Sequence, residues 1–95
     1  MTAYVIVDIQ VTDPRGYEEY KKLAPAIVES FGGKYLARGG KTEILEGDWS
    51  PSRLVILQFE SSEQAKKWVN SSEYSEARKM RLATTNSKMV VIEGV

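Results

Sequence analysis

The chain contains no cysteine and no histidine among its 95 residues. Without cysteine there is no disulfide framework, no thiolate metal site and no cysteine nucleophile. Without histidine, a serine-histidine-acid triad, a histidine-ligated haem and a histidine-based zinc site are excluded as well. The glycine pairs at 32–33 and 39–40 form neither a P-loop nor a dinucleotide-binding fingerprint. We therefore predict no metal and no cofactor, and any proton transfer falls to Asp, Glu, Lys or Tyr.

The sequence also lacks an excess of charge of either sign. Its 13 basic and 13 acidic residues balance, and no block of like charge stands out. This distribution argues against a protein that binds nucleic acid or an anionic membrane. No apolar run approaches the ~20 residues that span a bilayer, and the amino terminus shows no secretory signal. We expect a soluble, cytoplasmic protein whose partner is a small molecule or another protein.

Three short segments are apolar at nearly every position, which is typical of strands buried on both faces. They are residues 4–7, 54–57 and 89–92. The strands predicted around them cover residues 4–11, 53–59 and 88–93. Another strand covers residues 34–38 and resumes at 41–46, and the glycine pair between these parts favours one long bent strand.

Two helical regions separate the predicted strands. Asp13-Pro14 supplies a cap and a first-turn proline, so a helix is expected over residues 16–31, ended by a glycine pair. Pro25 predicts a kink in this helix or its division into two. A capping box at residues 61–64 opens the second region, with the Gln side chain reaching back to the cap. Residues 70–72 interrupt this region before a further helical piece.

The element order is strand, helix, strand, repeated once. It predicts an α+β, ferredoxin-like β-α-β-β-α-β fold with a four-stranded antiparallel sheet, in a single domain over residues 1–95. Both helical regions then lie on one face of the sheet. The opposite face would leave an apolar patch that soluble monomers rarely tolerate, so we predict a homodimer in which two such faces pack together. The residues expected on this face are Tyr4, Ile6, Asp8, Arg38, Leu54 and Ile56.

Arg38, with Gly39 beside it, is the first candidate for ligand binding. A guanidinium held on a strand that faces an enclosed space is a good bidentate receptor for a carboxylate or a phosphate. A structural role is equally consistent with the sequence. In that case Arg38 forms a salt bridge with Glu46, Glu93 or an acid of the partner chain.

Two further candidates for ligand binding are Arg81 and Trp49. Arg81 lies three residues after Arg78 on a helix, and the pair either joins an anion site or, as such pairs more often do, forms a solvated face. Trp49 lies in a loop with no obvious structural reason for a tryptophan. It either walls a pocket or, as we favour, anchors an interface with the partner chain. Trp68, in contrast, is expected to pack in the core.

Asp8, Glu93 and Tyr74 are the candidate catalytic residues. Asp8 and Glu93 are acids set within apolar strands, where a carboxyl group is a candidate general base. Exposure at a sheet edge or pairing with Arg38 explains these two acids as well. Tyr74 lies on an apolar helix face, so it either belongs to the core or turns its hydroxyl toward a cavity.

Four short motifs together resemble one family across essentially the whole chain. They are GGKYLARGG (residues 32–40), EGDW (46–49), NSSEY (70–74) and VIEGV (91–95). In their combination the chain closely resembles the DUF1330 family. The resemblance implies a ferredoxin-like fold that dimerises sheet to sheet, the dimeric α+β barrel, and it implies no particular reaction. The wider superfamily includes cofactor-independent monooxygenases, isomerases, haem enzymes and stress-response proteins, and the absence of histidine argues against its haem-binding branch.

Two functions are therefore open. In the first, the chain binds a small organic acid in a cavity between the two sheets and transforms it without a cofactor, with Arg38 holding the anionic group. In the second, the chain is a non-catalytic dimeric module in which Arg38 and Trp49 serve the interface. A pocket of roughly 300 Å³ or more that contains Arg38 would favour the first, and a filled interior would favour the second.

Overall fold

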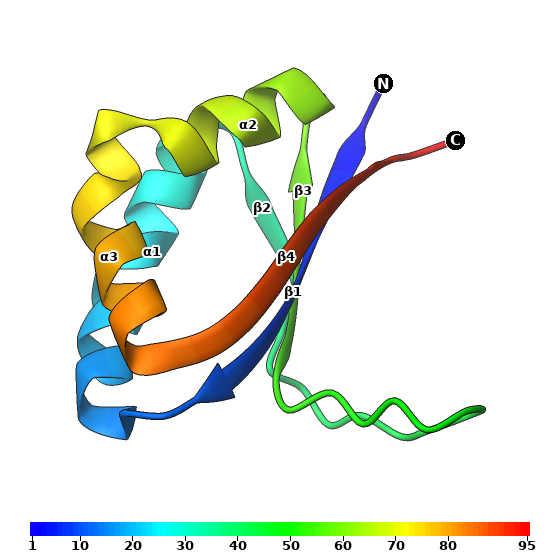
Figure 1. The fold of residues 1–95 in the computed structure, drawn as a ribbon. Coiled ribbons are helices and arrows are strands. Elements are labelled where there is room, and N and C mark those ends of the chain that lie inside the picture. Colours follow the sequence, from blue (N-terminus) through cyan, green and yellow to red (C-terminus); the bar gives the residue numbers. More distant parts are fainter.

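A computed structural model describes all of residues 1–95, with four strands and three helices. Their bounds are β1 (Ala3–Val11), α1 (Pro14–Ser30), β2 (Lys34–Arg38), β3 (Leu54–Phe59), α2 (Ser62–Asn70), α3 (Ser72–Thr84) and β4 (Thr85–Glu93). The strands form one antiparallel sheet in the order β2-β3-β1-β4, and the helices all lie on one side of it (Figure 1). The predicted ferredoxin-like α+β fold is confirmed, with the second helical region divided in two.

The alternation of side chains along β1 and β3 gives the sheet two different faces. Val7 is buried beneath the helices, whereas Ile6 and Asp8 are half-buried on the other face. The register places Val7 opposite Val55 and Ile6 opposite Ile56. Because successive side chains of a strand point to opposite faces, the continuous apolar runs supply both faces at once.

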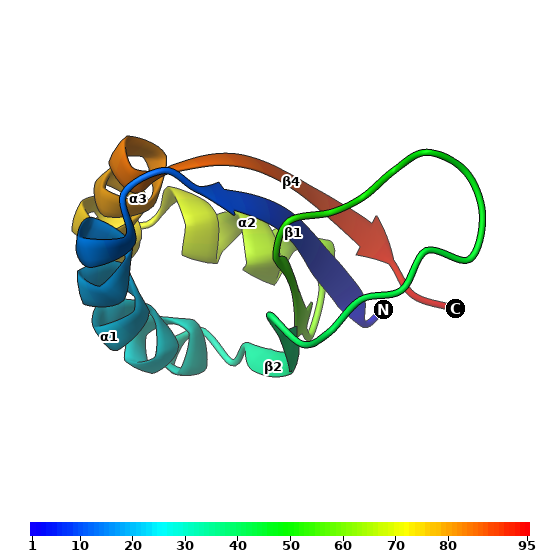
Figure 2. The same ribbon diagram turned by 90° about the horizontal axis from the view of Figure 1, so that it is seen from below.

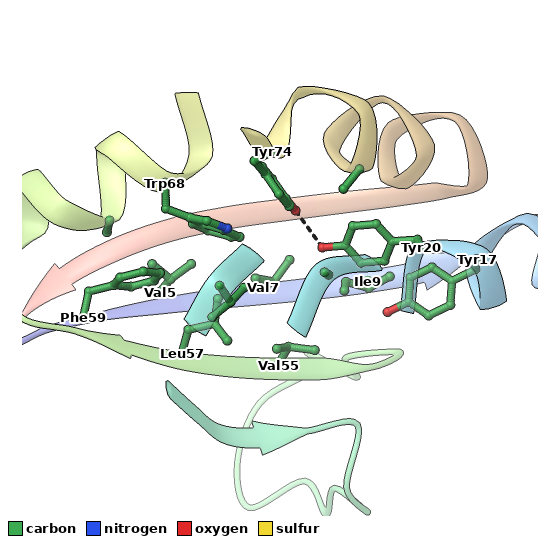
Figure 3. Close-up of a cluster of buried hydrophobic side chains, with 14 residues drawn as sticks. Val5, Val7, Ile9, Tyr17, Tyr20, Val55, Leu57, Phe59, Trp68 and Tyr74 are labelled. Atoms are coloured by element: carbon green, nitrogen blue, oxygen red, sulfur yellow. Dashed lines mark hydrogen bonds between the residues drawn. The ribbon is translucent and has the colours of Figure 1, made fainter. Parts of the chain in front are cut away.

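A row of aromatic rings joins the three helices to the sheet (Figure 3). Phe59 stacks on Trp68 of α2 with ring centres 5.4 Å apart, and Trp68 lies 4.6 Å from Tyr74 of α3. Tyr74 meets Tyr20 of α1 edge-on at 6.4 Å, and Tyr20 stacks on Tyr17 at 5.5 Å. Each aromatic pair contributes about 0.5–1.5 kcal/mol beyond the burial of its area. The row therefore fixes the helices relative to the sheet, and the expectation of a core role for Trp68 is confirmed.

Local signals set the first helix. Asp13 caps α1 by accepting a hydrogen bond from the Gly16 N–H at 3.2 Å. The helix then runs through Pro25 as one element, so Pro25 does not divide it in two. Ala24 and Val28, on either side of the proline, are buried and keep the helix packed against the sheet. None of the three helices is long and apolar enough to cross a membrane.

The capping box before α2 forms only in part. Ser61 Oγ accepts the expected hydrogen bond from the Gln64 N–H at 3.1 Å. The Gln64 side chain donates to the carbonyl of Phe31 at 2.9 Å instead of reaching back to Ser61, because the end of α1 offers a carbonyl that the helix itself leaves unpaired. The expected interruption is present, with Ser71 capping α3. β4 begins at Thr85 directly after α3, three residues earlier than expected.

The expected continuation of the second strand through residues 41–46 is wrong. β2 ends at Arg38, and Gly39 turns the chain at φ +71° while its N–H makes the last ladder bond to the carbonyl of Leu54 (2.8 Å). Residues 40–52 make no backbone-to-backbone hydrogen bond and form a loop that projects from the end of the sheet (Figure 2). Pro51 and the turn-forming residues around it keep β3 from extending alongside residues 41–46 as a pairing partner.

The sheet face opposite the helices is apolar and uncovered in the single chain. Val90 and Ile92 of β4 are 60% and 56% exposed, and Ile6 and Ile56 beside them are half-buried. Only the projecting loop shares that side of the sheet with them (Figure 1). The face is therefore available to another surface.

Candidate functional site

A small cavity of about 20 Å³ lies between α1 and the helix-facing side of the sheet. Its apolar and aromatic walls come from all parts of the fold, since Tyr17 and Tyr20 line it from α1, Tyr35 from β2, Leu57 from β3 and Trp68 from α2. This volume has room for about one water molecule or a group of similar size. It is far below the roughly 300 Å³ of a typical ligand pocket.

All charged residues that line the cavity are cations. They are Lys21, Arg38, Arg53 and Arg81, contributed by four different segments of the chain. Lys21 forms an exposed salt bridge with Glu18 at 2.8 Å, whereas none of the three arginines lies within 4.0 Å of a carboxylate. A cluster of unneutralised cations at a partly buried site attracts anions more strongly than the same charges would in water.

Arg38 and Arg53 are held by neutral groups. Arg38 Nη2 donates to the carbonyl of Lys21 on α1 at 3.2 Å, and its guanidinium lies over the Tyr35 ring at 4.8 Å. Arg53 Nε donates to the Tyr17 hydroxyl at 3.2 Å and lies over that ring at 5.7 Å. Both side chains are thus oriented without being neutralised, which leaves their charges available to an anion.

Arg38 lies on the helix side of the sheet, and the expectation that it faces outward with Asp8 is wrong. A register shift between Tyr35 and Ala37 inserts one extra residue into β2 and places Arg38 opposite the buried Val55. Without this bulge, alternation from Tyr35 would turn Arg38 to the outer face. The bulge therefore brings Arg38 into the cavity.

Gly39 supports the position of Arg53. A Cβ atom built on Gly39 would collide with Arg53 Nη1, and the φ of +71° also favours glycine there. Gly39 does not line the cavity. It acts through Arg53, whose guanidinium occupies the space that a Cβ on residue 39 would fill.

Tyr20, Trp68 and Arg81 line the inner, more deeply buried end of the cavity. Tyr74, which does not line it, contacts Tyr20 there. The hydroxyls of Tyr20 and Tyr74 are hydrogen-bonded at 2.6 Å (Figure 3). Burial raises the pKa of Tyr20, and Tyr74 raises it further, so the Tyr20 phenol stays protonated. Arg81 Nη1 donates to Ser87 Oγ, whereas Arg81 Nε and Trp68 Nε1 are buried without a hydrogen-bond partner.

Asp8 and Trp49 lie together, but on the outer face of the sheet. Trp49 Nε1 donates to Asp8 Oδ2 at 3.2 Å, and the Ser52 N–H donates to Asp8 Oδ1 at 3.2 Å. Trp49 is 60% exposed. Asp8 therefore fastens the projecting loop to β1, and neither residue reaches the cavity.

The remaining expected residues divide between the cavity and the surface. Arg81 lines the cavity, whereas Arg78 donates to the carbonyl of Val69 (3.2 Å) and to Asn70 Oδ1 (3.3 Å) at the junction of α2 and α3. Glu93 is exposed at the end of β4 opposite Ala3, and no salt bridge joins Glu46 or Glu93 to Arg38.

Sequence reasoning missed two residues that shape the cavity. Arg53 precedes an apolar strand, and only the register of the sheet brings it beside Arg38. Trp68 is a core residue as expected, but its unpaired indole N–H is visible only once its neighbours are placed.

Comparisons with known proteins place the chain among proteins of the same fold. A family model for a domain of unknown function, DUF1330, matches residues 2–95. The solved structure of the RPA0582 protein of unknown function from Rhodopseudomonas palustris has a TM-score of 0.80 and 18% identity, covering 99% of this chain and 82% of that one. No curated protein matches the sequence.

Two other solved structures are similar at lower identity. A dimeric ferredoxin-like protein of unknown function from Jannaschia sp. CCS1 has a TM-score of 0.68 and 12% identity, with 99% of this chain and 100% of that chain covered. SnoaB, a cofactor-independent oxygenase from Streptomyces nogalater, has a TM-score of 0.60 and 13% identity, with 99% and 92% covered. At these identities the likeness concerns the fold alone.

Proposed function

The chain belongs to the DUF1330 family, and we propose that it binds a small organic anion in the cavity between its helices and its sheet. One observation carries this proposal: three arginines without a carboxylate partner line a single cavity together with Lys21, and no carboxylate lines it. Placing like charges together in a partly buried site is unfavourable unless an anion compensates them. The proposal keeps the organic acid expected from the sequence and moves its site to the other side of the sheet.

The size of the cavity limits the group that enters it. About 20 Å³ holds one group the size of a water molecule, so one oxygen of a carboxylate fits there and a ring does not. Arg38 is exposed and Lys21 half-buried, so these two residues mark the outer end of the cavity. We infer that a carboxylate head lies between Arg53 and the inner donors while the rest of the ligand extends toward Arg38.

Within the cavity, Lys21 and the tyrosine hydroxyls are the groups able to transfer a proton, and Lys21 is already paired with Glu18. Because burial raises the pKa of Tyr20, its phenol stays protonated at neutral pH and serves as a hydrogen-bond donor, and it is poorly suited to act as a general acid or base there. Asp8 and Glu93 are remote from the cavity, so they are not part of this site. The proposal is therefore one of binding, with chemistry limited to what a protonated phenol supports.

A thermal-stability screen tests the proposal. Small carboxylates and their amides would be added to the protein at constant ionic strength. A ligand that binds only the folded state adds about 2.7 kcal/mol of stability at 100 times its dissociation constant. We expect stabilisation by carboxylates, and its loss in R53M but not in R78M, because Arg78 lies outside the cavity. Equal responses of both variants would contradict the proposal.

A homodimer through the outer sheet face is the second part of the proposal. Exposed Val90 and Ile92 adjoin Ile6 and Ile56 there, and such a contiguous apolar surface is rare on soluble monomers. The similar protein from Jannaschia is described as dimeric. A second copy applied by two-fold symmetry covers the face on both chains. A light-scattering mass of two chains at micromolar concentration is expected, and a mass of one chain would contradict this part.

A non-catalytic dimeric module is the alternative function. The observation that favours it is the small volume of the cavity, since the interior is otherwise filled by the aromatic row. On this alternative the protein forms the same dimer, and no carboxylate stabilises it in the screen.

A further inference from the structure

We propose that the indole N–H of Trp68 and the Nε–H of Arg81 form the inner end of the anion site and make it select an oxyanion over an uncharged analogue of the same shape. This inference rests on the proposed function, since it names the groups that recognise the anion and the chemical class they accept. It predicts a carboxylate, such as acetate, in preference to the matching amide, acetamide.

The two donors are buried and unpaired. Trp68 is 1% exposed and Arg81 is 4% exposed, yet Trp68 Nε1 and Arg81 Nε have no hydrogen-bond partner. Nearly all buried polar groups of folded proteins are paired. Of the three buried donors without a partner, Arg78 Nε lies outside the cavity, whereas the other two line it and call for a shared acceptor. The view in Figure 3 shows the indole nitrogen of Trp68 on the edge of the ring that faces Tyr20 and Tyr74.

Neighbouring contacts hold both donors in place before a ligand arrives. Phe59 and Tyr74 pack against the Trp68 ring, with centres at 5.4 and 4.6 Å. Arg81 is fixed at its far end, where Nη1 donates to Ser87 Oγ of β4. Donors that are already oriented lose little freedom when a ligand binds. They are therefore a rigid receptor and not a flexible surface.

The polar groups of the cavity are almost all donors. Besides Trp68 and Arg81, the guanidinium of Arg53 offers N–H groups beyond the Nε that binds Tyr17. The only side-chain acceptors are phenol oxygens, and the hydroxyls of Tyr17 and Tyr20 already take part in hydrogen bonds. A carboxylate has two acceptor oxygens and no donor, so it matches this set. An amide would direct its NH₂ donors at the donors of the protein.

The indole resonances provide a direct test. The chain has two tryptophans, so ¹⁵N-labelled protein shows two indole N–H signals, and W68F assigns them. Trp49 donates to Asp8 on the opposite face of the sheet and serves as an internal control. Acetate and acetamide would be titrated at constant ionic strength. We expect acetate to shift the Trp68 signal saturably, acetamide to leave it in place, and neither to move the Trp49 signal.

Affinities of two conservative variants complete the test. W68F keeps an aromatic ring and removes the N–H, and R81K keeps the charge and removes Nε. We expect each to weaken acetate binding about tenfold or more, since a hydrogen bond to a charged acceptor commonly corresponds to that change. The ratio of acetate to acetamide affinity should fall in both. If W68F does not fold, W49F assigns the two indole signals instead, because Trp49 is exposed, and the titration of the unmodified protein then decides.

The possible failures are distinguishable. If acetate binds with the Arg53 dependence described above while the Trp68 signal stays still, this inference is overturned and the proposed function stands. If acetate and acetamide shift the Trp68 signal alike, the cavity takes any small polar molecule, water included, and the selectivity is overturned. If no carboxylate binds at all, the inference and the proposed function fall together.

Discussion

Gly39 lies directly against the guanidinium of Arg53, so that a Cβ atom on Gly39 would overlap Arg53 Nη1. The two residues stand at opposite ends of the projecting loop, and Arg38 immediately precedes the glycine. Arg38 and Arg53, from the two ends of the loop, therefore meet in one cavity. They can do so because Gly39 has no side chain to occupy the position of the Arg53 guanidinium.

Substitution of this glycine tests the relationship. We expect G39A to displace Arg53 from the cavity and to cost about 1–2 kcal/mol of folding stability, because a non-glycine residue is strained at φ +71°. G40A is the matched control, since a Cβ there meets no atom within 4 Å and the φ is not positive. Urea unfolding and carboxylate affinity would be measured for both. Unchanged affinity in G39A would show that Arg53 does not depend on the glycine.

The burial of the Tyr20 phenol should make the fold less stable at alkaline pH. Burial raises its folded pKa above the unfolded value of 10.0. Its contribution to stability is therefore complete below about pH 10 and is lost as the pH rises further, because only the unfolded state then releases the proton. The free energy of unfolding should fall by up to about 1.4 kcal/mol per pH unit from this group. The free energy of unfolding, measured with urea at about pH 9 to 11, should fall less steeply with pH in Y20F than in the unmodified protein. The same pH dependence in both proteins would contradict the role given to Tyr20.

Asp8 should control the mobility of the projecting loop. D8A removes the acceptor of both Trp49 Nε1 and the Ser52 N–H. Since these groups are exposed, the expected loss of global stability is about 1 kcal/mol or less. Trypsin should cleave after Lys41 faster in D8A than in Q10A, whose substitution lies on the same strand face. Equal cleavage rates would mean that the loop does not depend on Asp8.

The outer sheet face should not tolerate a charge. Ile56 pairs with Ile6 in register at the centre of this face. I56K would place an ammonium group without a partner in the proposed apolar interface, so it should convert the proposed dimer to a monomer or unfold the protein. E29K, on the exposed surface of α1, is the control and should keep the mass of the unmodified protein. A dimeric, folded I56K would exclude this face as the interface.

The sequence predicts the fold well because its periodic signals are local. Alternation in β1, the Asp13 cap of α1 and the break near Ser71 each act over a few residues, and each is present in the structure. The prediction of a strand over residues 41–46 is wrong for the same reason. Their extended pattern is a local signal, but a strand also needs a partner beside it, and β3 begins too late to supply one.

The site is less predictable because it depends on register. One inserted residue in β2 decides that Arg38 faces the helices, and no property of Leu36 or its neighbours marks a bulge there. The role of Arg53 depends in turn on the pairing of β2 with β3. Of the candidates taken from the sequence, Arg38 and Arg81 line the cavity, whereas Asp8 and Trp49 lie together on the other face of the sheet. Arg53 lines the cavity and is not among those candidates.

Calorimetric titration with acetate, at constant ionic strength, determines whether the cavity is an anion site. We expect saturable binding of one acetate per chain in the unmodified protein and unchanged binding in R78M. In R53M, binding should weaken about tenfold or more, because a hydrogen bond from a guanidinium to a carboxylate corresponds to at least that factor. Absence of saturable heat in the unmodified protein, or equal affinity in all three proteins, would contradict it.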